Sequence, residues 1–152
     1  MPGQNLKVEV VSLLDRRVVH WPLRKAVEIA LEGQGPVGVT VLLCKNDIIQ
    51  GYNKRWREVD APTDVLSFKA APNQLQYLGD VAVSWDFALD QAKVRDVKPI
   101  EEAAMLAVHG TLHLLGMDDH TDAGRQDMVD KANEIMEKAG LPTDGNWHSL
   151  PH

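Results

Sequence analysis

The longest apolar helical stretch of the chain runs from Ala103 to Leu115, and no other segment constrains the fold as much. A helix of this composition is apolar around most of its circumference, which is typical of a helix inside a protein rather than one on its surface. The large apolar positions are Met105, Leu106, Val108, Leu112 and Leu115. The sequence therefore predicts a buried central helix that the other elements must cover.

Two histidines lie within this apolar stretch. His109 and His113 are four residues apart, so on a helix both imidazoles project from one face, one turn apart. This spacing suits the binding of a single metal ion. Buried imidazoles need polar partners, and hydrogen-bonded core histidines are the alternative to metal ligands. We predict a metal site on the buried helix.

The segment after the helix supplies candidates for a third ligand. Gly116 allows the helix to end in a left-handed turn, after which Asp118, Asp119 or His120 can approach the two histidines. Three protein ligands and an open fourth position are typical of catalytic zinc, whereas structural zinc sites have four ligands. Imidazoles also bind nickel and copper. The expected cofactor is one zinc ion, with nickel or another divalent metal as alternatives.

The rest of the chain predicts four strands and about five helices. Short apolar or alternating runs predict the strands, at 6–11, 37–44, 65–68 and 79–84. Amphipathic spacing and terminal breakers predict the helices, at about 23–31, 47–57, 86–94, 103–115 and 122–138. We expect an α+β fold of mixed layers, with a four-stranded sheet packed against the helices in one domain over residues 1–152. The segment 143–152 has no periodicity, and we expect it to be loosely held.

Charge is unevenly distributed along the chain. The sequence has 16 Lys and Arg residues against 22 Asp and Glu residues, a net charge of −6, which argues against a general nucleic-acid binder. Residues 1–69 hold ten cationic and eight acidic side chains, whereas residues 70–152 hold six and fourteen. Five cations lie ahead of the histidine motif and predict a local basic groove: Lys45, Lys54, Arg55, Arg57 and Lys69.

Cysteine use and hydropathy indicate the compartment. Cys44 is the single cysteine, so the chain can form no internal disulfide, and an unpaired thiol favours the reducing cytoplasm. We expect neither a signal peptide nor a membrane span, because the longest apolar run, Val37–Cys44, is far shorter than a transmembrane helix.

Three sequence blocks, in order along the chain, resemble those of a known family. Residues His109–His120 read HGTLHLLGMDDH and resemble the signature HGxLHLxGYDH of the YbeY family, metal-dependent endoribonucleases that are also called rRNA maturation factors. Residues Trp56–Phe68 resemble the family's YRGKDKPTDVLSF, and Leu78–Val83 resembles its strand LGDIVI. The resemblance extends from about Val8 to Leu141.

The resemblance implies a single-strand-specific, metal-dependent endoribonuclease. It implies action in ribosomal RNA processing, including 3′-end maturation of the small-subunit RNA, and in ribosome quality control. Implied partners are single-stranded RNA and rRNA, small-subunit ribosomal proteins and an assembly GTPase, in the cytoplasm and without a membrane. For the site, it implies catalytic roles for Arg57 and His113, with Arg57 stabilising the charge that develops on phosphate.

The chain departs from the family pattern at the third ligand. One additional residue separates His113 from His120, so Asp119 rather than His120 has the family's spacing. Either side chain can bind zinc. We favour His120, because a surface turn absorbs one residue easily, and we expect Asp119 to orient a ligand from outside the coordination shell.

Two other functions share these features. A zinc hydrolase of another substrate, such as peptide, would use the same three ligands, but Gly110 stands where HExxH proteases carry their glutamate base. A ribosome-associated binding protein with a structural metal would keep the histidines without needing Arg57 or an open coordination position. Assays of RNA cleavage with and without a chelator distinguish these functions.

Overall fold

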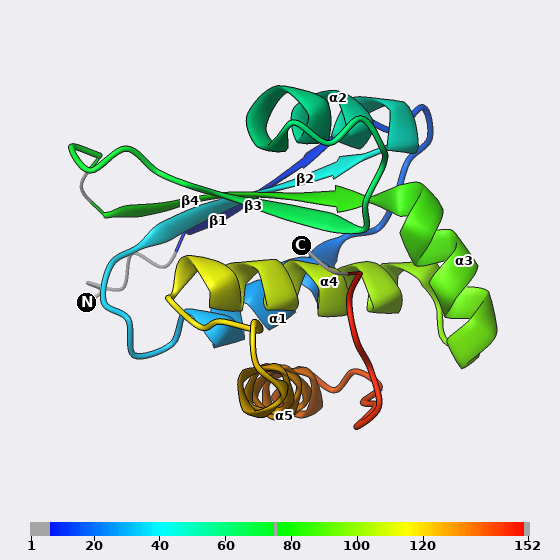
Figure 1. Ribbon diagram of the computed structural model, residues 1–152. Helices are drawn as coiled ribbons and strands as arrows, with labels where there is room; N and C mark the ends of the chain where they lie inside the picture. The colour runs from blue at the N-terminus through cyan, green and yellow to red at the C-terminus, as the bar shows by residue number, and fades with distance from the viewer. Residues whose placement is uncertain (1–6, 75, 151–152) are drawn as a thin grey trace.

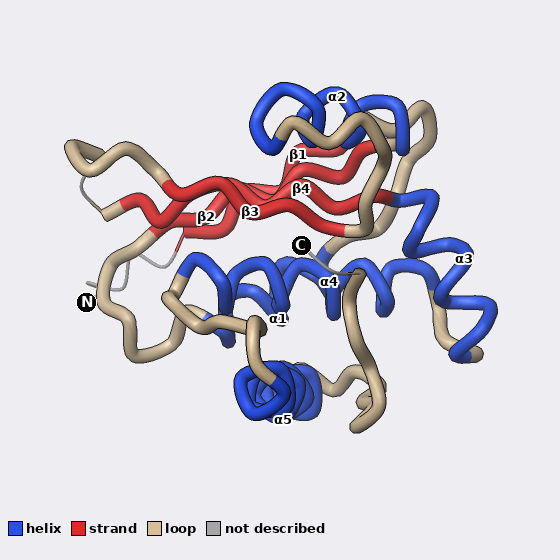
Figure 2. Tube along the Cα trace, viewed as in Figure 1, coloured by secondary structure: helices blue, strands red, loops and turns tan. Residues whose placement is uncertain are grey.

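A four-stranded sheet separates two helical layers in the computed structural model, which describes residues 7–74 and 76–150 (Figure 1). The chain order is β1 (Lys7–Ser12), α1 (Trp21–Ala30), β2 (Gly38–Cys44), α2 (Asn46–Arg57), β3 (Val65–Lys69), β4 (Tyr77–Ser84), α3 (Trp85–Arg95), α4 (Pro99–Leu114) and α5 (Asp122–Lys138). Helix α2 covers one face of the sheet, and α1 and α4 cover the other, with α5 beyond them (Figure 2). The predicted α+β class, four strands and five helices are confirmed.

The sheet has the strand order β1-β2-β4-β3. Strands β1, β2 and β4 are parallel, whereas β3 pairs antiparallel with β4 and forms an edge of the sheet. Parallel neighbours need a crossover connection, which α1 supplies between β1 and β2. Because side chains alternate along a strand, each face of the sheet meets its own helices. Strand β3 thus borders both helical layers at an open edge.

Helix α4 is the buried central helix that the sequence predicts. Every residue from Glu102 to Leu112 is buried, and the helix contacts the sheet, α1, α3 and α5. Position 110 faces the sheet, where an added Cβ would lie 2.6 Å from Cγ1 of Val81. Glycine therefore allows α4 to approach the strands closely. The Ser67 hydroxyl donates to the carbonyl oxygen of Gly110 at 2.8 Å and holds the helix against β3.

Helix α2 packs on the opposite face over a smaller apolar cluster. Ile49 of the helix meets Cys44, Leu66 and Ala82, which come from three different strands. The N-cap residue of α2, Lys45, makes no side-chain capping bond, and a tertiary contact takes that place, because the Asn46 N–H donates to a carboxylate oxygen of Asp86 at 2.7 Å. This contact fixes the start of α2 to the start of α3.

The segment after α5 is packed over residues 143–150, in contrast with the loosely held tail that the sequence predicts. Trp147 is only 5% exposed. Asn133 of α5 exchanges two hydrogen bonds of 2.9 Å with the backbone of Asp144, and the Leu150 N–H donates to Asp64 at 2.9 Å. Individual side chains anchor this segment, so its lack of periodicity gave no sign of its packing. We call residues 143–150 the C-terminal strap; residues 151–152 lie outside the described part of the chain.

Within the described residues, none of the helices is both long enough and apolar enough to cross a membrane.

Candidate metal centre

The two histidines of α4 face a common point. Their Nε2 atoms are 3.2 Å apart, and His109 is buried while His113 is partly exposed. Nδ1 of His113 lies 3.1 Å from the carbonyl oxygen of Met117. Donation from Nδ1–H to that carbonyl leaves the Nε2 lone pair of His113 available as a ligand. The turn after α4 thus orients one of the predicted ligands.

The same turn carries Asp119 to both imidazoles. Gly116 has φ +100° and ends α4 in the left-handed region, as the sequence predicts. The chain then reverses, and Oδ2 of Asp119 lies 3.6 Å from Nε2 of His109 and 3.4 Å from Nε2 of His113. All three donor atoms lie within 4.8 Å of one another. Two imidazoles and one carboxylate form a donor set that catalytic zinc sites use.

His120 lies outside this three-residue group. Its Nδ1 is 3.0 Å from Oδ1 of Asp118, and its side chain is 77% exposed. It forms a second, more exposed group with Asp118 and Asp119. The structure therefore places Asp119, and not the favoured His120, against His109 and His113, because the extra residue is accommodated beyond Asp119.

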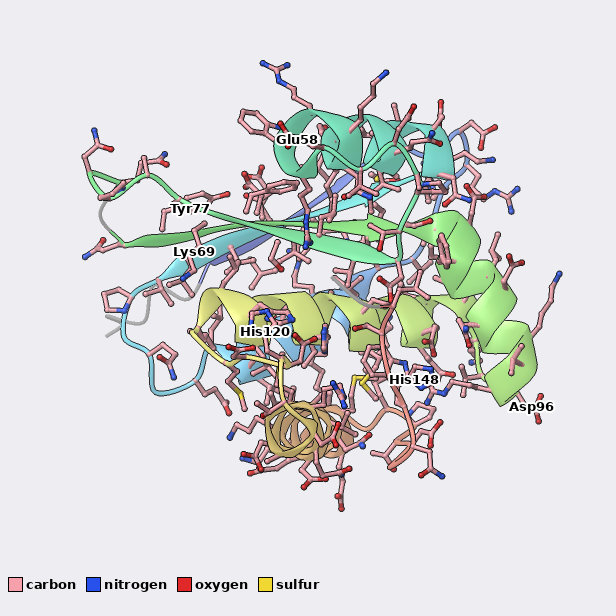
Figure 3. The ribbon with its side chains drawn as sticks, in the orientation of Figure 1. Glu58, Lys69, Tyr77, Asp96, His120 and His148 are labelled. Carbon is pink, nitrogen blue, oxygen red and sulfur yellow. The ribbon has the colours of Figure 1, made fainter. Side chains whose placement is uncertain are left out.

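Arg57 reaches the same hollow from the other helical layer. A hollow of about 350 Å³ is lined by Arg57, Ser67 and Lys69 on one side and by His113, Asp119 and His120 on the other. We call it the metal-side hollow. Arg57 is the last residue of α2, which Glu58 ends with φ +60°. Figure 3 shows Glu58 and His120 on opposite sides of the sheet, so the hollow crosses the β3 edge.

The hollow is lined by fewer cations than the five that the sequence predicts for a basic groove. Lys45 lies 3.9 Å from Asp86, and Lys54 lies 3.9 Å from Asp60, so both are near carboxylates. Arg57 and Lys69 are the cations that line the metal-side hollow among the described residues. The cationic side chains of the hollow therefore lie at the β3 edge.

The C-terminal strap also contacts His109. The rings of His109 and Trp147 have centroids 5.3 Å apart, and the Ser149 hydroxyl lies 3.1 Å from Nε2 of His109. Trp147 Nε1–H donates to the buried carboxylate of Glu102 at 2.8 Å. Sequence reasoning missed these contacts; the one available signal was an acidic residue, Glu102, at the start of an apolar helix.

Glu102 belongs to a charged network that secures the strap. Arg95 forms an ion pair with Glu102 and a second one, at 3.1 Å, with Asp144. Glu102 is 1% exposed and Arg95 is 12% exposed. A buried carboxylate needs such partners, so the network ties α3, α4 and the strap together behind the histidines.

Comparison with known proteins identifies the family. The model of a family described as "Endoribonuclease YbeY" matches residues 9–140, which is most of the chain. The chain belongs to the YbeY endoribonuclease family. A YbeY relative from Roseiflexus sp. (strain RS-1), named "Endoribonuclease YbeY", is 39% identical over 151 residues, covering 91% of this chain and 94% of the relative. The relative of the same name from Carboxydothermus hydrogenoformans is also 39% identical, covering 88% and 97%.

A solved structure shares the fold of this chain. The solution structure of a Thermotoga maritima protein matches with a TM-score of 0.64 at 25% identity, covering 87% of this chain and 88% of that protein. The resemblance stated from the three sequence blocks is thereby confirmed at the level of the family.

Proposed function

We propose that this YbeY-family chain is a metal-dependent endoribonuclease that cleaves single-stranded ribosomal RNA. The observation that carries the proposal is the shared lining of the metal-side hollow, where Arg57 lies with His113 and Asp119. Arg57 and the ligands come from distant parts of the sequence and from opposite faces of the sheet. A phosphodiester in the hollow would meet a guanidinium and a metal site together.

The residues present fit a divalent metal. His109, His113 and Asp119 offer two imidazole nitrogens and a carboxylate oxygen that converge, and the Met117 carbonyl orients His113. We therefore propose these three as the ligands, with zinc the expected metal. When bound, such an ion polarises a phosphoryl oxygen and lowers the pKa of water.

Arg57 supplies the complementary chemistry from α2. A guanidinium donates paired N–H bonds to phosphate oxygens, so Arg57 can orient the phosphodiester and stabilise the additional negative charge of the transition state. Lys69 adds a second positive charge to the same hollow. Of the two proposed histidine ligands, His113 is the one that lines the hollow, so it would lie beside a phosphodiester bound there.

The size and position of the hollow favour single-stranded over base-paired RNA as the substrate. Because the space is about 350 Å³ and lies between the ends of α2 and α4, a phosphodiester must enter a recess. A flexible single strand does so without first unpairing. Following the family resemblance, we propose 3′-end maturation of small-subunit rRNA and ribosome quality control as the setting, in the cytoplasm. Ribosomal proteins and an assembly GTPase are the proposed partners.

Substitution of Arg57 tests this function. We expect Arg57→Lys to lower the rate of single-stranded RNA cleavage about a hundredfold, because lysine keeps the charge but loses the paired donors. Lys54→Ala on the same helix is the matched control and should leave cleavage unchanged. Rates are measured on purified, metal-loaded protein. Equal cleavage by wild type and Arg57→Lys would remove the proposed role.

Chelation separates catalysis from a structural metal. We expect a chelator to stop cleavage while circular dichroism still reports a folded chain, since a large apolar core holds α4 independently of the ligands. Unfolding on chelation would instead support the ribosome-associated binding protein with a structural metal. The peptide hydrolase is disfavoured, because position 110 faces the sheet and carries no carboxylate.

A further inference from the structure

A second recess lies on the α2 face of the sheet and shares a wall with the metal-side hollow. Its volume is about 770 Å³. Arg57, Ser67 and Lys69 line both spaces, so the two adjoin at the β3 edge. We call the second recess the α2-face groove. Apart from the shared wall, the residues of the α2-face groove have no role in the function proposed above.

The groove exists because α2 covers only part of its face of the sheet. The helix packs on the end of β2 and β4 that holds Cys44 and Ala82. Nearer the other end of the same strands, Thr40 and Asp80 remain as groove lining. Three aromatic side chains form the apolar walls, Tyr52 and Trp56 from α2 and Phe68 from β3.

The aromatic walls are held by neighbouring side chains. Tyr52 and Phe68 meet edge to face, with ring centroids 6.0 Å apart and an interplanar angle of 71°. The guanidinium of Arg55 lies over the Trp56 ring, 5.0 Å from its centroid. Trp56 is nevertheless 62% exposed. An indole kept in place yet accessible is suited to stacking on a flat ligand.

The groove carries positive charge at one place and negative charge at another. The cations Arg57 and Lys69 lie at the wall shared with the metal-side hollow. Asp80, an exposed residue of β4, lines the groove but not the hollow, and its carboxylate accepts a hydrogen bond from the Tyr77 hydroxyl. Phosphate is therefore attracted to the shared wall and repelled from the part of the groove beside Asp80, whereas an uncharged aromatic group meets no such repulsion.

We propose that the α2-face groove binds one unpaired nucleobase of the RNA strand whose phosphodiester lies in the metal-side hollow. The proposal rests on the function proposed above and adds a subsite to it. Trp56 supplies the stacking surface, Tyr52 and Phe68 enclose the base, and Arg57 and Lys69 bind the phosphate that joins the two spaces. An apolar peptide is the competing occupant, but it would leave the cations of the shared wall without a partner from the ligand.

Binding of short single-stranded RNA tests the subsite. We expect Trp56→Ala to weaken affinity roughly tenfold, and Trp56→Phe to retain most of it, because base stacking needs an aromatic ring. Trp21→Ala is the matched control, since Trp21 is also 62% exposed but lies at the start of α1, away from the groove. Circular dichroism confirms that each variant is folded.

A position-resolved probe identifies the base. In wild type, a single abasic nucleotide should lower affinity most at one position next to the cleaved bond, and in Trp56→Ala that loss should disappear. At the same position, 2-aminopurine fluorescence should be quenched by wild type and Trp56→Phe but not by Trp56→Ala. Uniform abasic effects, or quenching that Trp56→Ala retains, would overturn the subsite.

The outcomes separate the subsite from the proposed function. Binding and quenching are read with chelator present, so they do not depend on cleavage. If wild type binds with one Trp56-dependent position but never cleaves, the subsite stands and the nuclease proposal fails. If wild type cleaves and Trp56→Ala matches it in affinity and quenching, the subsite alone fails. A groove that binds apolar peptide and no base would also overturn it.

Discussion

The turn after α4 decides which single side chain completes the proposed metal centre. Met117 accepts from the His113 ring, Asp118 pairs with His120, and Asp119 faces both imidazoles. Each of these consecutive residues therefore has a different partner. Side-chain chemistry alone did not separate Asp119 from His120, because both are ordinary zinc ligands.

Metal content tests the assignment of Asp119. We expect Asp119→Ala to lose most of its bound metal, because it removes one of three converging donors, whereas His120→Ala should retain it. Elemental analysis of protein purified without an affinity tag measures the occupancy. Loss of metal in His120→Ala with full occupancy in Asp119→Ala would restore the ligand that the sequence favoured.

Cys44 provides a residue-level test of the core. The thiol is fully buried, and burial raises its pKa from 9.0 to about 12. Because the folded pKa lies above the unfolded value, the stability that this difference contributes is complete below about pH 9 and is lost as pH rises towards 12. At pH 8 the thiol should resist alkylation in the native protein and react once urea unfolds it. Rapid native labelling, followed by mass spectrometry, would contradict this burial.

At the level of elements, the contact between α4 and the sheet fixes the histidines. Gly110 follows His109 directly and lies on an adjoining face of the helix, about 100° further round, against Val81 and Ser67. The close fit of this face on the strands therefore sets the direction in which the imidazoles of α4 point. One turn of α4 therefore carries both the glycine that packs on the sheet and the two proposed histidine ligands.

Two glycine substitutions test this fit. Gly110→Ala should destabilise the protein by about 1–3 kcal/mol through overpacking. Gly51→Ala, in α2, meets no atom within 4 Å and should stabilise it by about 0.5–1 kcal/mol through helix propensity. Urea unfolding measures both. Similar effects of the two substitutions would show that α4 does not depend on a close approach at position 110.

The difference between local sequence signals and long-range packing explains what could be predicted from the sequence. Helix α5 begins at Asp122 and ends at Lys138, as predicted, because periodicity and terminal residues are local signals. The partners of Asp119 and Trp147 depend on a turn and on distant packing, which no local pattern encodes. The place of Arg57 beside the ligands was expected only through the family resemblance, since α2 and α4 are far apart in sequence.

Across the whole molecule, the C-terminal strap links the core to the metal centre. Trp147 contacts His109 on one side and donates to Glu102 on the other. Glu102 in turn pairs with Arg95, which also binds Asp144 of the strap. Stability and metal binding should therefore respond together to changes in the strap.

Substitution of Trp147 tests that linkage. Trp147→Ala should cost about 3–5 kcal/mol of unfolding free energy and also weaken metal binding, because a buried ring and a donor to Glu102 are lost. Trp147→Phe keeps a ring beside His109 and should cost about 1–3 kcal/mol with metal binding largely retained. Denaturant titration and competition with a metal indicator measure the two quantities. Unchanged stability in Trp147→Ala would show that the strap is not held as described.

The crossing of the metal-side hollow over the β3 edge has a consequence for synthesis of the chain. Arg57 precedes β3, whereas His109, His113 and Asp119 follow β4 and α3. Since chains emerge from the ribosome N-terminus first, Arg57 and Lys69 are made before any of the three proposed ligands. Among the described residues, the only strand neighbour of β3 is β4, and α4 packs on both strands, so the hollow is assembled only after α4 and the turn that follows it have been made.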